Sequence, residues 1–221
     1  MPLEYKGITI SWLGHDSFRI KFQGKIIYID PYNLKKSYEP ADVICVSHNH
    51  FDHLSYDDLK KLVVDKTVLV GAQECKDGFD KFKKNKKIYL LPGQEIEVEG
   101  IKIKAVPAYN INKFRSPGVV FHPKSDNKIG FVLNIGGVTI YHAGDTDNIP
   151  EVKGLKPDIA LLPVSGTYVM TKEEAVQAVK DIMPKIAIPM HYGTIVGTEQ
   201  DAIYFKNNAP KEIEVHILQP E

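Results

Sequence analysis

Three histidines and an aspartate stand within six positions of this chain, in the pattern His48-x-His50-x-Asp52-His53. Imidazole nitrogens and a carboxylate oxygen are ligands that suit a borderline-soft divalent ion such as zinc. A turn that gathers them would form a metal site, whereas three unconnected surface histidines at this spacing would be a rare coincidence. The segment therefore predicts metal binding.

The neighbouring residues indicate how this segment is held. The apolar run over residues 43–46 is typical of a buried strand, and Ser55 with Asp58 three positions later can cap a helix. Proteins of the α/β class bind ligands at the carboxyl ends of such strands. We therefore expect the first two histidines of the pattern to reach one ion, and its aspartate and last histidine to face a second ion beside it.

Other candidate residues lie at further predicted strand ends. Alternating apolar residues predict strands over residues 8–12 and 17–30, with a turn at residues 23–25. His15 interrupts this hairpin and Asp30 closes it. Both are expected near the metal loop, in contact with metal ligands or with substrate, although a loop histidine and a turn carboxylate without such roles are the alternatives.

The second half of the chain adds two candidates of the same kind. A predicted strand over residues 138–143 ends at Gly144-Asp145-Thr146, and another over residues 185–190 ends at His191. Apolar spacing predicts helices over residues 73–84 and 171–182, the second beginning with a capping box. The lysines at positions 83–87 are interpreted as a solvated helix face and not as a nucleic-acid patch.

A long irregular stretch is expected over residues 107–127. Loops of this length in compact domains are commonly functional, and the aromatic, arginine and histidine content argues against disorder. We predict a substrate loop over the metal site, in which Arg115 and His122, with His15 and Tyr192, orient an anionic substrate. An exposed arginine without a role is the alternative for Arg115.

The motif at residues 48–53, the Gly144-Asp145-Thr146 element and the late His191-Tyr192 pair resemble the metallo-β-lactamase superfamily, and more closely its ascorbate-6-phosphate lactonase-like branch, over nearly the whole chain. The resemblance implies an α/β fold, namely a four-layer αββα sandwich with pseudo-twofold halves. It also implies two divalent ions, zinc or alternatively manganese or iron. The implied ligands are His48, His50 and Asp145 for one ion, and Asp52, His53, Asp145 and His191 for the other.

One position departs from the superfamily pattern. A third histidine ligand normally follows a strand in the region where this chain has Asn110. An amide oxygen binds zinc more weakly than an imidazole does. Asn110 is therefore predicted as a weaker ligand of the first ion, and His122 or His15 in its place is the alternative.

The function implied by the resemblance is that of a metal-dependent hydrolase. A hydroxide between the ions would attack an ester-type bond, a lactone or a phosphoester, in a small anionic substrate, and Asp52 would take and pass protons. Two alternatives are a nucleic-acid phosphodiesterase like ribonuclease Z and a non-catalytic metal-binding module with an eroded first site. The sequence offers no recognisable tRNA-binding arm for the former.

Composition bounds the remaining possibilities. The 221 residues, 43% of them hydrophobic, suffice for a single domain over residues 1–221. Lys+Arg and Asp+Glu both number 28, so no net charge attracts nucleic acid or membrane. No signal peptide is recognised and no apolar run approaches the roughly 20 residues of a membrane span. We expect a cytoplasmic location, reduced core thiols at Cys45 and Cys75, and a small-molecule substrate as partner, with a homo-oligomer left open.

Short segments of the first half recur in the second. Residues 24–28 resemble residues 137–141, residues 41–44 resemble residues 157–160, and residues 66–68 resemble residues 185–187. Two β-rich halves, each with a helix between buried strands, would pack sheet on sheet with the helices outside. The loops that carry the candidate ligands would then meet at one edge.

Overall fold

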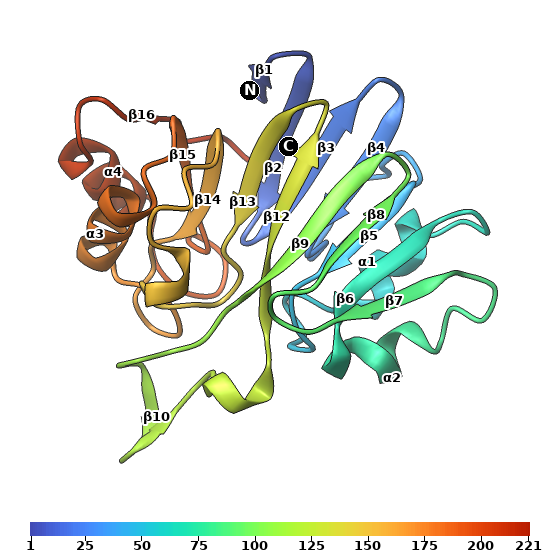
Figure 1. The fold of residues 1–221 in the computed structure, drawn as a ribbon, viewed down its shortest axis with the longest axis horizontal. Helices are drawn as coiled ribbons and strands as arrows, with labels where there is room; N and C mark the ends of the chain where they lie inside the picture. Colours follow the sequence, from blue (N-terminus) through green and yellow to red (C-terminus); the bar gives the residue numbers. More distant parts are fainter.

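Two seven-stranded sheets pack against each other in the computed structural model, which describes residues 1–221 (Figure 1). The first sheet has the order β1-β2-β3-β4-β5-β6-β7. Its strands are β1 (Leu3–Tyr5), β2 (Ile8–Gly14), β3 (Ser17–Phe22), β4 (Lys25–Ile29), β5 (Val43–Val46), β6 (Val68–Ala72) and β7 (Lys87–Leu90). Strands β1 to β4 pair antiparallel, and β4 to β7 pair parallel.

The second sheet repeats this division. Its order is β16-β15-β14-β13-β12-β9-β8, parallel from β16 to β13 and antiparallel from β13 to β8. Its strands are β8 (Glu95–Val98), β9 (Ile101–Pro107), β12 (Ile129–Ile135), β13 (Val138–His142), β14 (Ile159–Pro163), β15 (Ile186–Met190) and β16 (Glu214–Val215). Each sheet therefore has one parallel half whose strand ends can carry ligands.

Helices cover the outer faces of the two sheets. Helices α1 (Tyr56–Leu62) and α2 (Lys76–Phe79) lie outside the first sheet, and α3 (Lys172–Ile182) and α4 (Glu199–Asn208) lie outside the second (Figure 1). Three short 3₁₀ turns complete the structure: η1 (Gln73–Cys75), η2 (Lys124–Asp126) and η3 (Pro150–Val152). The predicted αββα sandwich is confirmed. None of the helices has the length and apolar character that a membrane span requires.

The apolar residues explain the layering. Every residue of β5, β6, β14 and β15 is buried, as expected for parallel strands that are covered on both faces. Strand β9 instead alternates buried and exposed residues over its first four positions, because part of one face meets solvent. A single cluster of 62 buried hydrophobic residues includes members of both sheets.

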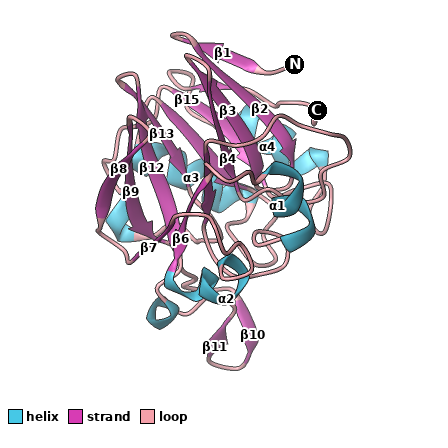
Figure 2. Cartoon of the chain, turned by 90° about the vertical axis from the view of Figure 1, so that its right-hand side faces the viewer, coloured by secondary structure: helices cyan, strands magenta, loops and turns pink.

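Three segments differ from the sequence-based expectation. The helix predicted over residues 73–84 is wrong beyond Phe79: only η1 and α2 form, with the poor helix former Gly78 inside the four-residue helix. Helix α4 was not predicted, since it buries only Ala202 and Phe205. Residues 107–127 are not wholly irregular: β10 (Phe114–Ser116) and β11 (Val119–Val120) form a hairpin that projects from the body (Figure 2).

Candidate metal centre

The candidate ligands come together from loops of both sheets. His15 and Asp16 stand in the turn between β2 and β3, and the motif at residues 48–53 follows β5. His122 follows the β10–β11 hairpin, while Asp145 and His191 follow β13 and β15. These side chains form two adjacent groups, each able to offer ligand atoms within 4.8 Å of one another.

The first group, here called the first position, consists of His48, His50, His122 and Asp145. His50 Nδ1 lies 3.1 Å from His48 Nε2 and 3.4 Å from His122 Nε2. Asp145 Oδ2 lies 3.4 Å from His122 Nε2 and 3.8 Å from His48 Nε2. Ligands bonded at about 2.0 Å to one tetrahedral zinc ion would lie about 3.3 Å apart. The four atoms therefore have nearly the spacing of a zinc site.

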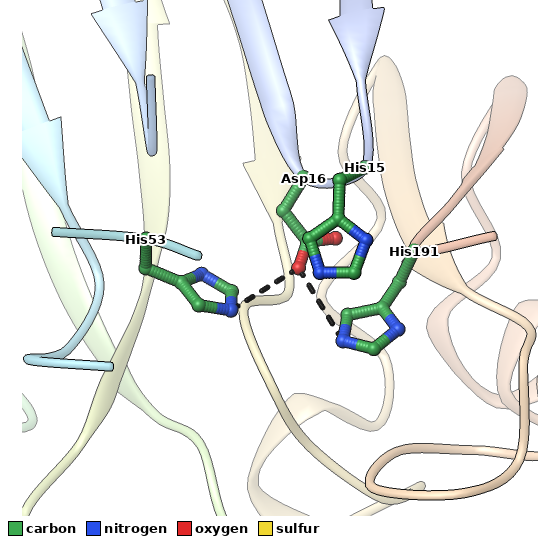
Figure 3. A group of neighbouring side chains, drawn as sticks. All are labelled: His15, Asp16, His53 and His191. Carbon is green, nitrogen blue, oxygen red and sulfur yellow. Dashed lines mark ion pairs between the residues drawn. The ribbon is translucent and has the colours of Figure 1, made fainter. Parts of the chain in front are cut away.

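The second group, here called the second position, consists of His15, Asp16, His53 and His191. Figure 3 shows Asp16 between the rings of His53 and His191. The other carboxylate oxygen of Asp145, Oδ1, lies 3.3 Å from His53 Nε2 and 3.4 Å from His191 Nε2. Asp145 thus contributes one oxygen to each position, so that its carboxylate lies between them.

Several candidate ligand atoms make no hydrogen bond within the protein. His53 Nε2, His191 Nε2, Asp145 Oδ1 and both oxygens of Asp16 are buried without a hydrogen-bond partner. Their mutual distances are short, but the geometry is not that of a hydrogen bond. Buried polar atoms are normally paired. These atoms therefore fit a divalent cation at the second position, as the spacing of the ligand atoms does at the first.

In three of these histidines, His48, His53 and His191, the ring nitrogen that faces away from the site makes a hydrogen bond. The partner of His48 Nδ1 is Ser47 Oγ at 2.9 Å, and that of His53 Nδ1 is Asp30 Oδ2 at 2.8 Å. For His191 Nδ1 the partner is Ser165 Oγ at 2.8 Å. Such partners fix the tautomer and leave Nε2 free for a metal.

Asn110, the predicted weak ligand, lies behind His122. Its Oδ1 accepts hydrogen bonds from the backbone N–H of His122 and from His122 Nδ1, both at 2.9 Å. Its Nδ2 donates to the carbonyl of Tyr168 at 2.8 Å. Both lone pairs of the amide oxygen are thus engaged, and the structure brings His122, the alternative named for this role, to the first position.

His15 and Asp52 form a pair at the rim of the second position. His15 Nε2 lies 3.0 Å from Asp52 Oδ2, and the same oxygen lies 3.8 Å from His53 Nε2. His15, which was expected to contact metal ligands or substrate, is fully buried and contacts Asp52, one of the predicted ligands. Asp30, the other turn candidate, accepts hydrogen bonds from the backbone and hydroxyl of Ser47 as well as from His53.

Arg115 and Tyr192, both predicted to orient substrate, lie apart from these groups. Arg115 is exposed on the β10–β11 hairpin. Tyr192 is buried against Trp12, with ring centroids 4.9 Å apart. The structure therefore brings neither side chain into the two positions.

A pocket of about 330 Å³ opens beside the first position. Four of its lining residues carry apolar or aromatic side chains, and no lysine or arginine lines it. The lining residues are His50, Phe51, Asp52, Phe121, His122, Asp145, Tyr168 and Ile195. A molecule in this pocket would meet candidate metal ligands on one side and apolar walls on the other.

The two positions differ in charge. Burial lowers the pKa of the imidazoles at the first position, to about 4 for His122, so these rings are neutral and able to bind a cation. At the second position burial opposes protonation of His191, but the carboxylates of Asp16 and Asp145 outweigh it and raise the pKa of that ring to about 9. The carboxylates of Asp16 and Asp145 therefore attract positive charge to the second position.

Asp16 is a site residue that the sequence-based reasoning did not select. Its neighbour His15 was selected, and the signal available was a second ionisable residue in the same interruption between two apolar strands. His15, Asp30 and His191 have positive φ angles of 51°, 44° and 60°, which non-glycine residues adopt rarely and often at functional sites.

Comparison with protein-family models gives a match to "Beta-lactamase superfamily domain" over residues 9–191. Among curated proteins, a UPF0173 metal-dependent hydrolase of Methanosarcina mazei is 32% identical over 191 residues, which are 78% of this chain and 77% of that protein. A UPF0173 metal-dependent hydrolase of Methanopyrus kandleri is 33% identical over 188 residues, 78% of each chain.

Solved structures with the same fold include a protein from Parabacteroides distasonis whose suggested activity is metal-dependent hydrolysis. It is 32% identical, with a TM-score of 0.81 over 99% of this chain and 98% of that one. A metallo hydrolase from Ignicoccus hospitalis, 21% identical, superposes with a TM-score of 0.75 over 96% of this chain and 95% of its own. The latter similarity concerns the fold alone.

Proposed function

The chain belongs to the β-lactamase superfamily and is a metal-dependent hydrolase of the UPF0173 group, and from this premise we propose that it cleaves an ester-type bond with the help of two divalent ions. The observation that carries the proposal is the placement of Asp145 between two groups of candidate ligands, all of them buried except His50. Zinc suits the first position, with three imidazoles and one carboxylate. Ions at such a site would activate water and polarise the bond to be cleaved.

Asp52 is the group proposed to handle protons. Burial opposes its ionisation, but the hydrogen bond from His15 and the nearby rings of His53 and His15 together outweigh that effect and lower the pKa of the Asp52 carboxyl. Asp52 also lines the pocket, so its carboxylate can accept a proton from water at the site and pass it to a leaving group. His15 keeps this carboxylate oriented.

The pocket walls support a substrate with an apolar part. Phe51, Phe121, Tyr168 and Ile195 present hydrocarbon to the pocket, and no cationic side chain faces it. The expectation of an anionic substrate named Arg115 together with His15, His122 and Tyr192, and the one permanent cation among them, Arg115, lies on the hairpin. We therefore propose a lactone or other ester whose negative charge, where it has one, is borne by the group that the ions bind, with an apolar remainder against these walls.

The test combines metal analysis with hydrolysis. Elemental mass spectrometry of protein purified without chelator should find two divalent ions per chain, and a panel of lactones, aryl esters and phosphoesters should reveal turnover of at least one class. His50→Ala should lose one ion and at least 100-fold in kcat/KM while keeping its circular dichroism spectrum. His216→Ala, at a histidine bonded to Glu214 outside both positions, serves as the matched control.

Two results would overturn the proposal. Full turnover by His50→Ala would show that the first position takes no part in catalysis. If protein that holds two ions hydrolysed no ester class, the result would favour a metal-binding module without catalysis.

A further inference from the structure

Asp16 occupies an environment that a carboxylate rarely tolerates. Its side chain is fully buried, and neither of its oxygens accepts a hydrogen bond. A buried carboxylate without hydrogen bonds is unfavourable unless a cation lies beside it.

The groups around Asp16 are arranged about a shared point. Asp16 Oδ2 lies 3.4 Å from His53 Nε2 and 3.8 Å from His191 Nε2 (Figure 3). Charge-assisted N–H···O hydrogen bonds are shorter, at about 2.7–2.9 Å. Distances of this longer kind are those between two ligands of one ion, and Asp145 Oδ1 stands at similar distances from the same two nitrogens.

We infer that Asp16 is a ligand of the ion at the second position, and that it makes this position prefer a harder ion than the first. This inference rests on the two-ion site proposed above. With Asp16, three carboxylates face the second position, the others being Asp52 and Asp145, whereas one faces the first.

The difference in donor atoms sets the expected metals. Three imidazoles and one carboxylate at the first position suit zinc. At the second position His15 Nε2 is engaged by Asp52, which leaves the imidazoles of His53 and His191 with three carboxylates. Such an oxygen-rich set suits manganese or iron(II) and a higher coordination number. The chain is therefore expected to bind zinc at the first position and manganese or iron(II) at the second.

The experiment measures metal binding directly. Because zinc binds most sites more tightly than manganese does, metal-free wild type and Asp16→Asn are given one equivalent of Zn²⁺ and an excess of Mn²⁺, and the ions per chain are counted by elemental mass spectrometry after free ions are removed. Mn²⁺ affinity is measured by electron paramagnetic resonance. Wild type should hold one zinc and one manganese, and Asp16→Asn should bind Mn²⁺ at least tenfold more weakly while it retains one zinc. Asp77→Asn, at an exposed residue of the short helix α2, is the control.

Thermal melting separates a ligand from a structural carboxylate. Without metal, Asp16→Asn should melt at or above the temperature of wild type, because an unpaired buried charge is removed, and its gain on adding Mn²⁺ should be smaller. Unchanged Mn²⁺ affinity in Asp16→Asn, or a lower melting temperature without metal and the same gain with it, would overturn the inference. A wild type that never binds a second ion would instead overturn the two-ion proposal itself.

Discussion

Asn110 determines how His122 faces the first position. Its amide oxygen accepts from both the backbone N–H and the Nδ1 of that histidine, and its Nδ2 is held by the Tyr168 carbonyl and lies 3.3 Å from Asp147 Oδ1. The ring is therefore fixed as the tautomer whose Nε2 is free. Partners of this kind commonly contribute 10–100-fold to metal affinity.

Replacing Asn110 should weaken metal binding without abolishing it. Asn110→Ala is expected to lower zinc affinity about 10–100-fold, because the His122 ring loses its orienting acceptor, whereas His122→Ala should lose the first-position ion altogether. Zinc competition against a chromophoric chelator measures both constants. Asn148→Ala, at an amide that bonds Asp181, is the control. Equal losses in Asn110→Ala and His122→Ala would favour a direct ligand role for Asn110.

The sequence predicted most of the residues that meet at the two positions, but not which of Asn110 and His122 would face the first position. The motif at residues 48–53 is compact and directly follows an apolar run, so its position after β5 could be predicted from the sequence. The choice between Asn110 and His122 depends on the path of the hairpin that separates them, and no local pattern encodes that path. Asp16 was not selected because its neighbours come from distant parts of the chain, His53 after β5 and His191 after β15.

Helix α3 fixes the start of the loop that leads to His122. Its capping box joins Thr171 and Glu174, and Glu174 also accepts hydrogen bonds from the buried Lys113 at 2.6 Å and from Asn112 at 2.7 Å. Asp147 accepts from the backbone of Asn112 at 3.0 Å. The capping box could be predicted because its two residues are close in the sequence. The contacts of Glu174 with Asn112 and Lys113 could not, because they join distant parts of the chain.

Removing the hydroxyl at the cap should cost stability alone. Thr171→Ala is expected to lower the free energy of unfolding by about 1 kcal/mol, because the N–H of Glu174 loses its acceptor. Urea unfolding monitored by circular dichroism measures the change, and Thr171→Ser, which keeps a hydroxyl, should stay near wild type. A loss of bound metal in the folded Thr171→Ala protein would show that the cap also controls the first position.

The two halves of the molecule share more than their strand order. In each half an aspartate before a buried strand accepts hydrogen bonds from a backbone N–H of the preceding strand and from a lysine before the next one. The partners are Ile26 and Lys66 for Asp42, and Thr139 and Lys185 for Asp158. The sequence repeats that predicted a pseudo-twofold sandwich thus correspond to equivalent contacts opposite the metal edge of the sheets.

Asp158 should stabilise the whole fold in a pH-dependent way. Burial opposes its ionisation, but Lys185 and Thr139 outweigh that effect and lower its pKa to about 2 from the usual 3.8. A lowered pKa gives stability that is present above the unfolded value and is lost as pH falls through the folded one. Asp158→Asn should therefore cost about 1–2 kcal/mol at pH 7, with the deficit shrinking between pH 4 and 2. Urea unfolding at pH 7, 5 and 3 measures it, with Asp77→Asn as control. A deficit that grew on acidification would show that Asp158 is not the carboxylate that links the strands.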